Sequence, residues 1–464
     1  MPASDLGHNC GVFAIYGNRK AAKLTYFGLY ALQHRGQESA GIATSDRNDI
    51  HIFKGMGLVN EVFSRRDIFN QLKGTIAIGH NRYSTTGSSQ LRNAQPLFSR
   101  FKGHQLAVGH NGNITNSATL RNRLESTGAL FQTTSDSELF LHLIAKSRKT
   151  DMVDKIIYAL RQIQGAYCTV FMTRDAIYAA RDPRGFRPLA LGRLNKSYVI
   201  ASETCAFDLI GARYVRDILP GEIVKIDRNG LKSYHPFSQV KKAFCIFEFI
   251  YFSRPDSKIF CENVDKVRRR LGRQLAREHP VEADIVISVP DSSNTAALGF
   301  SEASGIRMEI GFIRNHYVGR TFIDPEQKIR DLDVKIKFNP VRGVIEGRRI
   351  VMVDDSIVRG TTSRKLIKML REAGAKEIHF RVSAPPIISP CYYGIDMPTK
   401  EELIGSNKKV EEIRRYLGAD SLGYLSIEGM LSMNSLPTEN FCVACFSNKY
   451  PTRLERRNGK YNLE

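Results

Sequence analysis

The fold of the C-terminal half is decided by the stretch IVMVDDSIVRGTT, residues 350–362. Its apolar start, Ile350–Val353, predicts a buried strand, and Asp354 and Asp355 stand at the carboxyl end of that strand. A loop of small and hydroxyl residues follows, and Ser363–Ala373 has the period of an amphipathic helix. Ligands of open α/β sheets bind beyond the carboxyl ends of the strands, and N–H groups of a loop and helix start favour phosphate. We therefore expect this stretch to bind a ligand that carries hydroxyl and phosphate groups.

The sequence on both sides of this stretch repeats the order of strand, loop and helix. Ile285–Val289 and Glu377–Ser383 are further apolar runs of strand length, and the first ends in Pro290-Asp291-Ser292-Ser293. Strands that alternate with helices are typical of a parallel sheet. Residues 236–464 are therefore expected to form an α/β domain, with an exposed polar tail from Tyr450.

Residues 10–235 follow a different pattern of short apolar strands separated by Gly and Asn turns. Helical periodicity is found at residues 20–32, 135–148 and 152–163. Strands followed by pairs of helices indicate sheets covered by helices. The polar stretch Arg228–Lys242, which contains Gly230 and Pro236, is the expected domain boundary.

The composition of the 464 residues excludes several classes of protein. A hydrophobic content of 42% and a charged content of 25% are ordinary globular values, which excludes a disordered or fibrous protein. The first 30 residues lack a signal pattern, and no stretch approaches the ~20 apolar residues of a membrane span. Eight cysteines are too few for a disulfide scaffold. We expect a cytoplasmic protein with reduced thiols and no membrane partner.

The formal net charge of +21 raises the question of a nucleic-acid partner. The excess is spread along the chain, with +13 in residues 1–200 and +8 in residues 201–464. The densest cluster is Arg268-Arg269-Arg270 with Arg273 and Arg277, which we interpret as one solvated helix face. No nucleic-acid partner is therefore expected.

Cys10 opens an apolar strand after nine polar or small residues. If residues 1–9 are a propeptide that is removed, the new α-amino group, with a pKa of about 7.7–8.0, can serve as the base for the thiol of its own residue. The alternative is a small buried hydrophobe, the commoner fate of a single cysteine.

Cys10-Gly-Val-Phe is followed by an ordered series of motifs. They are His34-Arg-Gly-Gln-Glu-Ser-Ala-Gly41, Gly79-His-Asn-Arg-Tyr-Ser-Thr-Thr-Gly87, Gly109-His-Asn-Gly-Asn-Ile-Thr-Asn116 and Thr134-Ser-Asp-Ser-Glu138. The series resembles the class II, N-terminal nucleophile glutamine amidotransferase domain over roughly residues 10–235. The resemblance implies an αββα sandwich in which Cys10 is the nucleophile and Asn111 and Gly112 form the oxyanion hole. It also assigns the substrate's α-carboxylate to Arg82, its α-ammonium to Asp136, and a place beside the nucleophile to Arg35. In precursor relatives the residue before the nucleophile is often acidic, whereas here it is Asn9.

Residues 350–362 resemble the phosphoribosylpyrophosphate (PRPP) motif of type I phosphoribosyltransferases. This resemblance implies that PRPP is bound by the following residues: Asp354, Asp355, Ser356, Arg359, Gly360, Thr361 and Thr362. Ser293 matches a family Mg²⁺ ligand, together with Asp354 and Asp355, and such oxygen ligands suit that ion. The stretch Tyr317–Lys337 matches a loop that closes over PRPP, in which Arg320, Lys328 and Arg330 are candidate phosphate contacts.

With the segment Glu248–Ser257, the resemblance covers almost the whole chain and is to the glutamine PRPP amidotransferase family. It implies that Cys10 releases ammonia from glutamine and that the ammonia displaces pyrophosphate from PRPP. The product would be 5-phosphoribosylamine, in the committed step of purine synthesis. The family also implies inhibition by purine nucleotides and a homotetramer.

Four cysteines form a separate candidate metal site. Cys442 and Cys445 form a CxxC pair, and Cys245 and Cys391 lie upstream. These positions match the cluster ligands of the iron–sulfur branch of the family, and four thiolates suit a [4Fe–4S] cluster. A tetrahedral zinc ion uses the same ligands, so both metals stay open. The resemblance assigns no role to the other thiols, Cys168, Cys205 and Cys261.

Two further functions are weighed against this one. Another class II amidotransferase, of the glucosamine-phosphate synthase type, needs a sugar-isomerase second half and no Asp-Asp-Ser motif. A PRPP-sensing regulator that binds DNA needs a helix-turn-helix and has no use for Cys10 with Asn111-Gly112. Both conflict with one half of this sequence.

Overall fold

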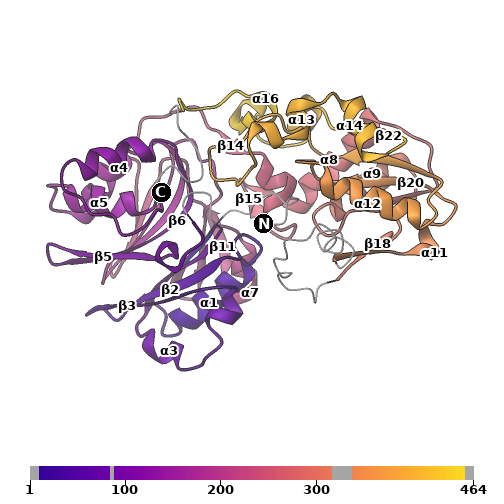
Figure 1. The fold of residues 1–464 in the computed structure, drawn as a ribbon. Helices are drawn as coiled ribbons and strands as arrows, with labels where there is room; N and C mark the ends of the chain where they lie inside the picture. The colour runs from indigo at the N-terminus through magenta and orange to yellow at the C-terminus, as the bar shows by residue number, and fades with distance from the viewer. Residues whose placement is uncertain (1–9, 84–87, 316–336, 455–464) are drawn as a thin grey trace.

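The computed structural model of the chain describes residues 10–83, 88–315 and 337–454. Two halves lie side by side, with most of the N-terminal half in indigo and purple and the C-terminal half running from rose through orange to yellow (Figure 1). In the described ranges, no helix is both long enough and apolar enough to cross a membrane.

The N-terminal half contains two antiparallel sheets. The seven-stranded sheet has the order β11 (Arg213–Asp217), β9 (Ala190–Leu194), β10 (Ser197–Ala201), β1 (Gly11–Tyr16), β4 (Ile76–Arg82), β2 (Ser39–Ser45) and β3 (Ile50–Met56). The six-stranded sheet has the order β13 (Gly230–Tyr234), β12 (Ile223–Asp227), β8 (Ile177–Arg181), β7 (Gly165–Met172), β6 (His104–Ile114) and β5 (Leu97–Phe101). The helices expected at 20–32, 135–148 and 152–163 are confirmed as α1 (Ala21–Ala31), α5 (Glu138–Lys146) and α6 (Met152–Leu160).

The layers of this half follow from the alternation of side chains along each strand. In β1, Val12, Ala14 and Tyr16 enter the core between the two sheets, whereas Phe13 and Ile15 enter the core beneath the outer helices. Those outer helices are α1, α2 (Val59–Val62), α3 (Ile68–Gln71) and α7 (Cys205–Ile210). The second sheet is covered by α4 (Ser117–Glu125), α5 and α6. The predicted αββα sandwich is confirmed.

The C-terminal half is built on a four-stranded parallel sheet. Its order is β17 (Ile285–Ser288), β20 (Arg349–Asp354), β21 (Glu377–Val382) and β22 (Ser421–Tyr424). Val351 and Val353 face the core under α8 (Val264–Glu278) and α9 (Asn294–Ser304). Ile350 and Met352 face the core under α12 (Thr361–Glu372) and α14 (Val410–Leu417). Burial on both faces explains the continuous apolar run of β20.

The remaining elements of the C-terminal half are short. Its smaller strand pairs are β14 (Phe244–Cys245) with β23 (Phe441–Cys442), β15 (Lys258–Ile259) with β16 (Glu262–Asn263), and β18 (Phe312–Arg314) with β19 (Phe338–Pro340). Its shorter helices are η2 (Glu248–Phe252), α11 (Arg342–Ile345), η3 (Lys400–Glu402), α13 (Ile404–Asn407), α15 (Ile427–Ser432), η4 (Thr438–Asn440) and α16 (Ala444–Ser447). One 3-10 turn, η1 (Leu91–Asn93), lies in the N-terminal half.

Within the expected boundary stretch 228–242, β13 forms a hairpin onto β12 that closes at Gly230, with φ of 103°, and the strand ends at Tyr234. Two expectations drawn from local sequence were wrong. Tyr450 is packed against Tyr392, and its hydroxyl donates to the Pro390 carbonyl (2.7 Å), so the tail begins inside the fold. Arg268 is only 2% exposed and does not belong to a solvated face.

Candidate active site

Cys10 lies immediately before β1, the middle strand of the seven-stranded sheet, and is 8% exposed. Its Sγ donates to the Tyr83 carbonyl (3.4 Å). Burial raises the pKa of the thiol to about 11, although the charge of Arg82 acts in the opposite direction. The thiol therefore needs a local base before it can act as a nucleophile.

Asn111 and Gly112 lie on β6 of the opposite sheet. Both side-chain amide atoms of Asn111 are buried and have no hydrogen-bond partner in the part of the chain that the structure describes. Gly112 has φ of 149°, and a Cβ at this position would lie 2.0 Å from the Ala166 carbonyl oxygen. A buried amide without a partner is costly unless a ligand completes it, and this pair is suited to receive a developing negative oxygen.

Arg82 and Asp136 bring opposite charges to this site. Arg82 ends β4, is 2% exposed, and donates to the Ser88 carbonyl (3.2 Å) with Glu38 at 3.6 Å. Asp136 is 5% exposed and accepts from the backbone N–H of Ile114 (2.9 Å). Both charges act on the Cys10 thiol, so the nucleophile has a cation and an anion near it.

Arg35 is completely buried and is engaged by protein groups. Its Nε donates to the Cys10 carbonyl (3.2 Å), Nη1 pairs with Glu203, and Nη2 donates to Glu248 (2.7 Å). Glu248 also accepts from Arg187 Nη1 (3.2 Å). Burial alone would raise the pKa of Glu248, but Arg35 and Arg187 hold it below its ordinary value. Arg35 thus holds the backbone of the nucleophile and joins it to the C-terminal half.

The second predicted site lies at the carboxyl end of β20. Asp354 and Asp355 are 8% and 5% exposed, and Asp355 accepts from the Ser356 hydroxyl (2.5 Å). Ser292, which follows β17, also donates its hydroxyl to Asp355. The predicted ligand Ser293 instead precedes the first residue of α9, and its hydroxyl donates to the Val289 carbonyl. The structure therefore places Ser292, rather than Ser293, against the acidic pair.

Two helices begin beside this acidic pair without side-chain caps. Gly360, with φ of 76°, precedes α12, and the hydroxyl of Thr362 is buried without a hydrogen-bond partner among the described residues. The same holds for the hydroxyl of Thr295 at the start of α9. Open helix starts with donors to spare are suited to phosphate.

The remaining predicted phosphate contacts divide into two groups. Arg359 turns to Glu402, to which its Nη2 donates (2.8 Å). Arg320, Lys328 and Arg330 lie outside the described residues. The structure therefore brings together the acidic pair and the helix starts, but it gives Arg359 a protein partner.

The four cysteines of the candidate metal site come from three segments. Cys245 and Cys442 are register partners in the paired strands β14 and β23. The backbone N–H of Ser389, a residue two positions before Cys391, donates to the Cys445 carbonyl (3.1 Å). Burial raises the pKa of Cys245 to about 11, and electrostatic interactions reach it from Cys391. No group of three or more His, Cys, Asp or Glu in the described ranges is arranged to hold a metal ion. The four thiols are near enough to one another to interact electrostatically.

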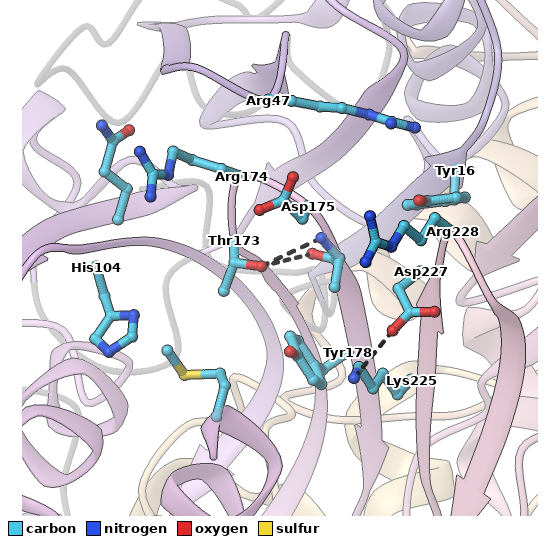
Figure 2. Close-up of a pocket in the computed structure, with 13 residues that line it drawn as sticks. Tyr16, Arg47, His104, Thr173, Arg174, Asp175, Tyr178, Lys225, Asp227 and Arg228 are labelled. Atoms are coloured by element: carbon cyan, nitrogen blue, oxygen red, sulfur yellow. Dashed lines mark hydrogen bonds and ion pairs between the residues drawn. The ribbon is translucent and has the colours of Figure 1, made fainter. Parts of the chain in front are cut away.

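A pocket of about 470 Å³ lies away from both sites, at the Tyr16 end of β1. Figure 2 shows Arg47, Arg174 and Arg228 lining it, with Lys225 paired to Asp227 (3.0 Å). It contains none of the predicted site residues, and Cys10 is at the opposite end of the same strand. Part of the basic excess of the N-terminal half therefore gathers at this end of the sandwich.

The comparisons with known proteins agree with this geometry. A family model described as a glutamine amidotransferase domain matches residues 80–208. The amidophosphoribosyltransferase of Bacillus subtilis is 49% identical, over 97% of this chain and 95% of its own length. The chain belongs to the amidophosphoribosyltransferase family. The sequence-based prediction that the chain belongs to this family is confirmed, as is the prediction that it is an enzyme with a glutamine amidotransferase half.

Two solved structures place the family resemblance in three dimensions. One, described as the allosteric regulatory enzyme of purine biosynthesis, matches 98% of this chain and 98% of its own with a TM-score of 0.94 and 48% identity. The other is the glutamine PRPP amidotransferase from B. subtilis in complex with ADP and GMP, which matches 98% of this chain and 100% of its own with a TM-score of 0.93 and 48% identity. Both halves of the amidophosphoribosyltransferase fold are therefore present, so the second half is not a sugar isomerase.

Sequence reasoning missed several residues that connect the halves. Glu248 stands alone in the apolar run Phe244–Phe252, and a single carboxylate in such a run signals a buried ion pair. Arg268 falls on the same helical stripe as Val264, Leu271 and Leu275, which was the available sign that it is buried. Glu203 and Arg187 carried no comparable signal.

Proposed function

We propose that this chain hydrolyses glutamine at Cys10 and transfers the ammonia to PRPP, forming 5-phosphoribosylamine, glutamate and pyrophosphate. The observation that carries the proposal is the buried amide of Asn111, which has no hydrogen-bond partner among the described residues and lies on the sheet that faces the strand of Cys10. The charges of Arg82 and Asp136 act on the buried Cys10 thiol. The second half supplies an acidic pair beside open helix starts.

The glutaminase reaction begins at Cys10. Removal of residues 1–9, which lie outside the described residues, would give Cys10 a free α-amine that accepts the thiol proton. The sulfur attacks the side-chain amide carbon of glutamine, and Asn111 and Gly112 donate to the oxygen as it becomes negative. Ammonia leaves, and water then cleaves the thioester to release glutamate. Arg82 binds the α-carboxylate of the substrate and Asp136 binds its α-ammonium.

The synthase reaction takes place beyond β20. Asp354 and Asp355 hold the ribose hydroxyls of PRPP, and the starts of α9 and α12 take phosphate groups. Ser356, Gly360, Thr361 and Thr362 belong to this phosphate loop, and Arg320 and Lys328 are proposed to close over it. Asp354 and Asp355, together with substrate oxygens, would hold Mg²⁺, which would supply positive charge to neutralise the pyrophosphate. The nitrogen of ammonia bonds to C1 of the ribose as pyrophosphate leaves.

Cys245, Cys391, Cys442 and Cys445 are proposed to hold a [4Fe–4S] cluster. The support is that four buried or half-buried thiols interact electrostatically with one another, and four thiolates suit such a cluster. Its role here is structural, because the site joins the C-terminal segment to β14. Iron and sulfide analysis of protein purified without oxygen tests this assignment, and stoichiometric zinc would contradict it.

Further properties of the chain are proposed from the family. Purine nucleotides are the proposed inhibitors, since one solved relative holds ADP and GMP. A homotetramer in the cytoplasm is the proposed working form. Sedimentation with and without nucleotide tests the oligomer.

The proposed reaction is tested by its stoichiometry. Purified protein is incubated with PRPP, Mg²⁺ and glutamine, and glutamate and pyrophosphate are measured together. We expect equal amounts of both products, and pyrophosphate release that continues when ammonium replaces glutamine. Glutamate formed without any use of PRPP would contradict the proposal.

A further inference from the structure

A continuous run of polar contacts, buried from Cys10 to Arg268 and part-buried from there to Asp355, connects the two sites. It starts at the Cys10 carbonyl, which Arg35 contacts, and passes to Glu248 through Arg35 Nη2 (2.7 Å). The hydroxyl of Ser253 donates to Glu248 (2.8 Å), and the carbonyl of the same Ser253 accepts from Arg268 (2.8 Å). The run thus reaches Arg268 on α8 from the glutaminase side.

Arg268 also contacts the synthase side. Its Nε donates to the Phe249 carbonyl (2.6 Å), and its Nη1 donates to the Ser292 carbonyl (3.4 Å). The hydroxyl of Ser292 donates in turn to Asp355. One guanidinium therefore touches the segment that holds the glutaminase network and the loop that holds the acidic pair.

We propose that Arg268 is a positioning residue for both reactions, because its guanidinium fixes the Ser292 loop against Asp355 and the Ser253 segment against Glu248. The inference rests on the proposed function. Arg268 touches no substrate in this scheme. It acts through Ser292 on PRPP binding and through Ser253, Glu248 and Arg35 on the backbone of Cys10.

The physical chemistry of the site favours arginine at this position. Arg268 is 2% exposed, and burying a cation is costly unless its donors are all directed at fixed acceptors. Here three different nitrogens are directed at three carbonyls from two segments. A planar guanidinium can hold such a divergent set, whereas the single ammonium of lysine cannot reach all three at once. The charge alone is therefore insufficient for the proposed role.

The two arms of the network can be cut separately. Ser253→Ala removes the hydroxyl that donates to Glu248 but keeps the carbonyl that accepts from Arg268. Ser292→Ala removes the hydroxyl that donates to Asp355 but keeps the carbonyl that accepts from Arg268. Arg268→Lys disturbs both arms while retaining the positive charge. Arg273→Met is the matched control, because Arg273 lies on the same helix and pairs with Glu302 at the surface.

The test measures glutamine hydrolysis and ammonium-dependent use of PRPP in separate assays of the full-length protein. Misplaced groups typically cost up to ~10²-fold in rate, so we expect Arg268→Lys to lower kcat/KM at least ~10-fold in both assays. Ser253→Ala should lower only glutamine hydrolysis, and Ser292→Ala should raise only the KM for PRPP. Arg273→Met should match the wild type in both assays.

The outcomes separate this inference from the proposed function. A wild-type protein that is inactive in both assays would refute the function itself. An active wild type with an unchanged Arg268→Lys variant would refute the positioning role. If Arg268→Lys does not fold, the serine variants decide the question, and equal effects of each serine variant on both assays would also refute it.

Discussion

The two candidate sites differ in how their polar side chains are buried and hydrogen-bonded. In the glutaminase site, Cys10 and Asn111 are buried between two antiparallel sheets, and the Asn111 amide is left without a partner in the described structure. In the synthase site, Asp355 is hydrogen-bonded by serine hydroxyls at the rim of a parallel sheet. In the proposed function, the first site receives one small zwitterion between two sheets, whereas the second uses loops and helix starts to receive a larger anion.

The largest expected effect comes from the acidic pair of the synthase site. Asp354→Asn combined with Asp355→Asn removes the charge that is proposed to hold the ribose hydroxyls and Mg²⁺. We expect both glutamine-dependent and ammonium-dependent pyrophosphate release to fall by more than ~10³-fold, since such an ion supplies several kcal/mol of stabilisation. Asp284→Asn is the control, because that carboxylate binds Arg349 at the opposite end of the sheet. Retained ammonium-dependent turnover would show that the two sites are not divided as described.

A smaller and one-sided effect is expected in the glutaminase site. Asn111→Ala removes a donor to the oxyanion, which typically costs about 2.7–4 kcal/mol or ~10²–10³-fold in rate. Steady-state glutamine hydrolysis measures this loss, and ammonium-dependent synthesis should stay at the wild-type level. The exposed Asn122 on α4 gives the control variant Asn122→Ala. A variant that loses both activities equally would mean that Asn111 supports the fold rather than the oxyanion.

The smallest expected effect concerns the pH dependence of stability. His80 on β4 is completely buried, and burial lowers its pKa from 6.5 to about 3. The unfolded chain takes up the proton first, so the stability gained from neutral His80 is present above pH 6.5 and is lost as the pH falls towards 3. The slope is at most about 1.4 kcal/mol per pH unit.

Urea unfolding at a series of pH values between 7 and 4 measures this slope. We expect His80→Gln, which keeps a donor for the His110 carbonyl, to flatten the loss of stability on acidification. The unfolding of the glutaminase half should therefore be more acid-sensitive than that of the parallel sheet. An unchanged pH profile would show that His80 does not contribute.

The layers of both halves were predicted correctly because the order of apolar and polar side chains along a strand shows which of its faces are buried. Ile350–Val353 is apolar throughout, and the structure buries it on both faces between α8 and α12. Cys10-Gly-Val-Phe and the Asn111-Gly112 pair were recognised from motif order, and the fold brings them to facing sheets. Local pattern and family resemblance therefore sufficed for the fold and for the residues nearest the expected chemistry.

What the sequence did not give was long-range pairing. The choice between Ser292 and Ser293 depends on how the loop enters α9, which adjacent serines cannot reveal. Arg35 was expected beside the nucleophile, but its partner Glu248 is more than 200 residues away in sequence. Arg268 was expected in solvent because it stands next to two other arginines, and only the helical stripe of α8 distinguishes it.

The central claim is that two separable sites act in sequence, and Cys10→Ala tests it most directly. Pyrophosphate release from PRPP is measured with glutamine and then with ammonium, for this variant and for Cys261→Ala, which changes an exposed thiol outside both sites. We predict that Cys10→Ala loses glutamine-dependent release. Ammonium-dependent release should stay within about twofold of the wild type, because the barrier of the synthase reaction should change by much less than the ~1.4 kcal/mol that alters a rate tenfold. Equal loss of both activities, or glutamine-dependent release that survives, would contradict the account.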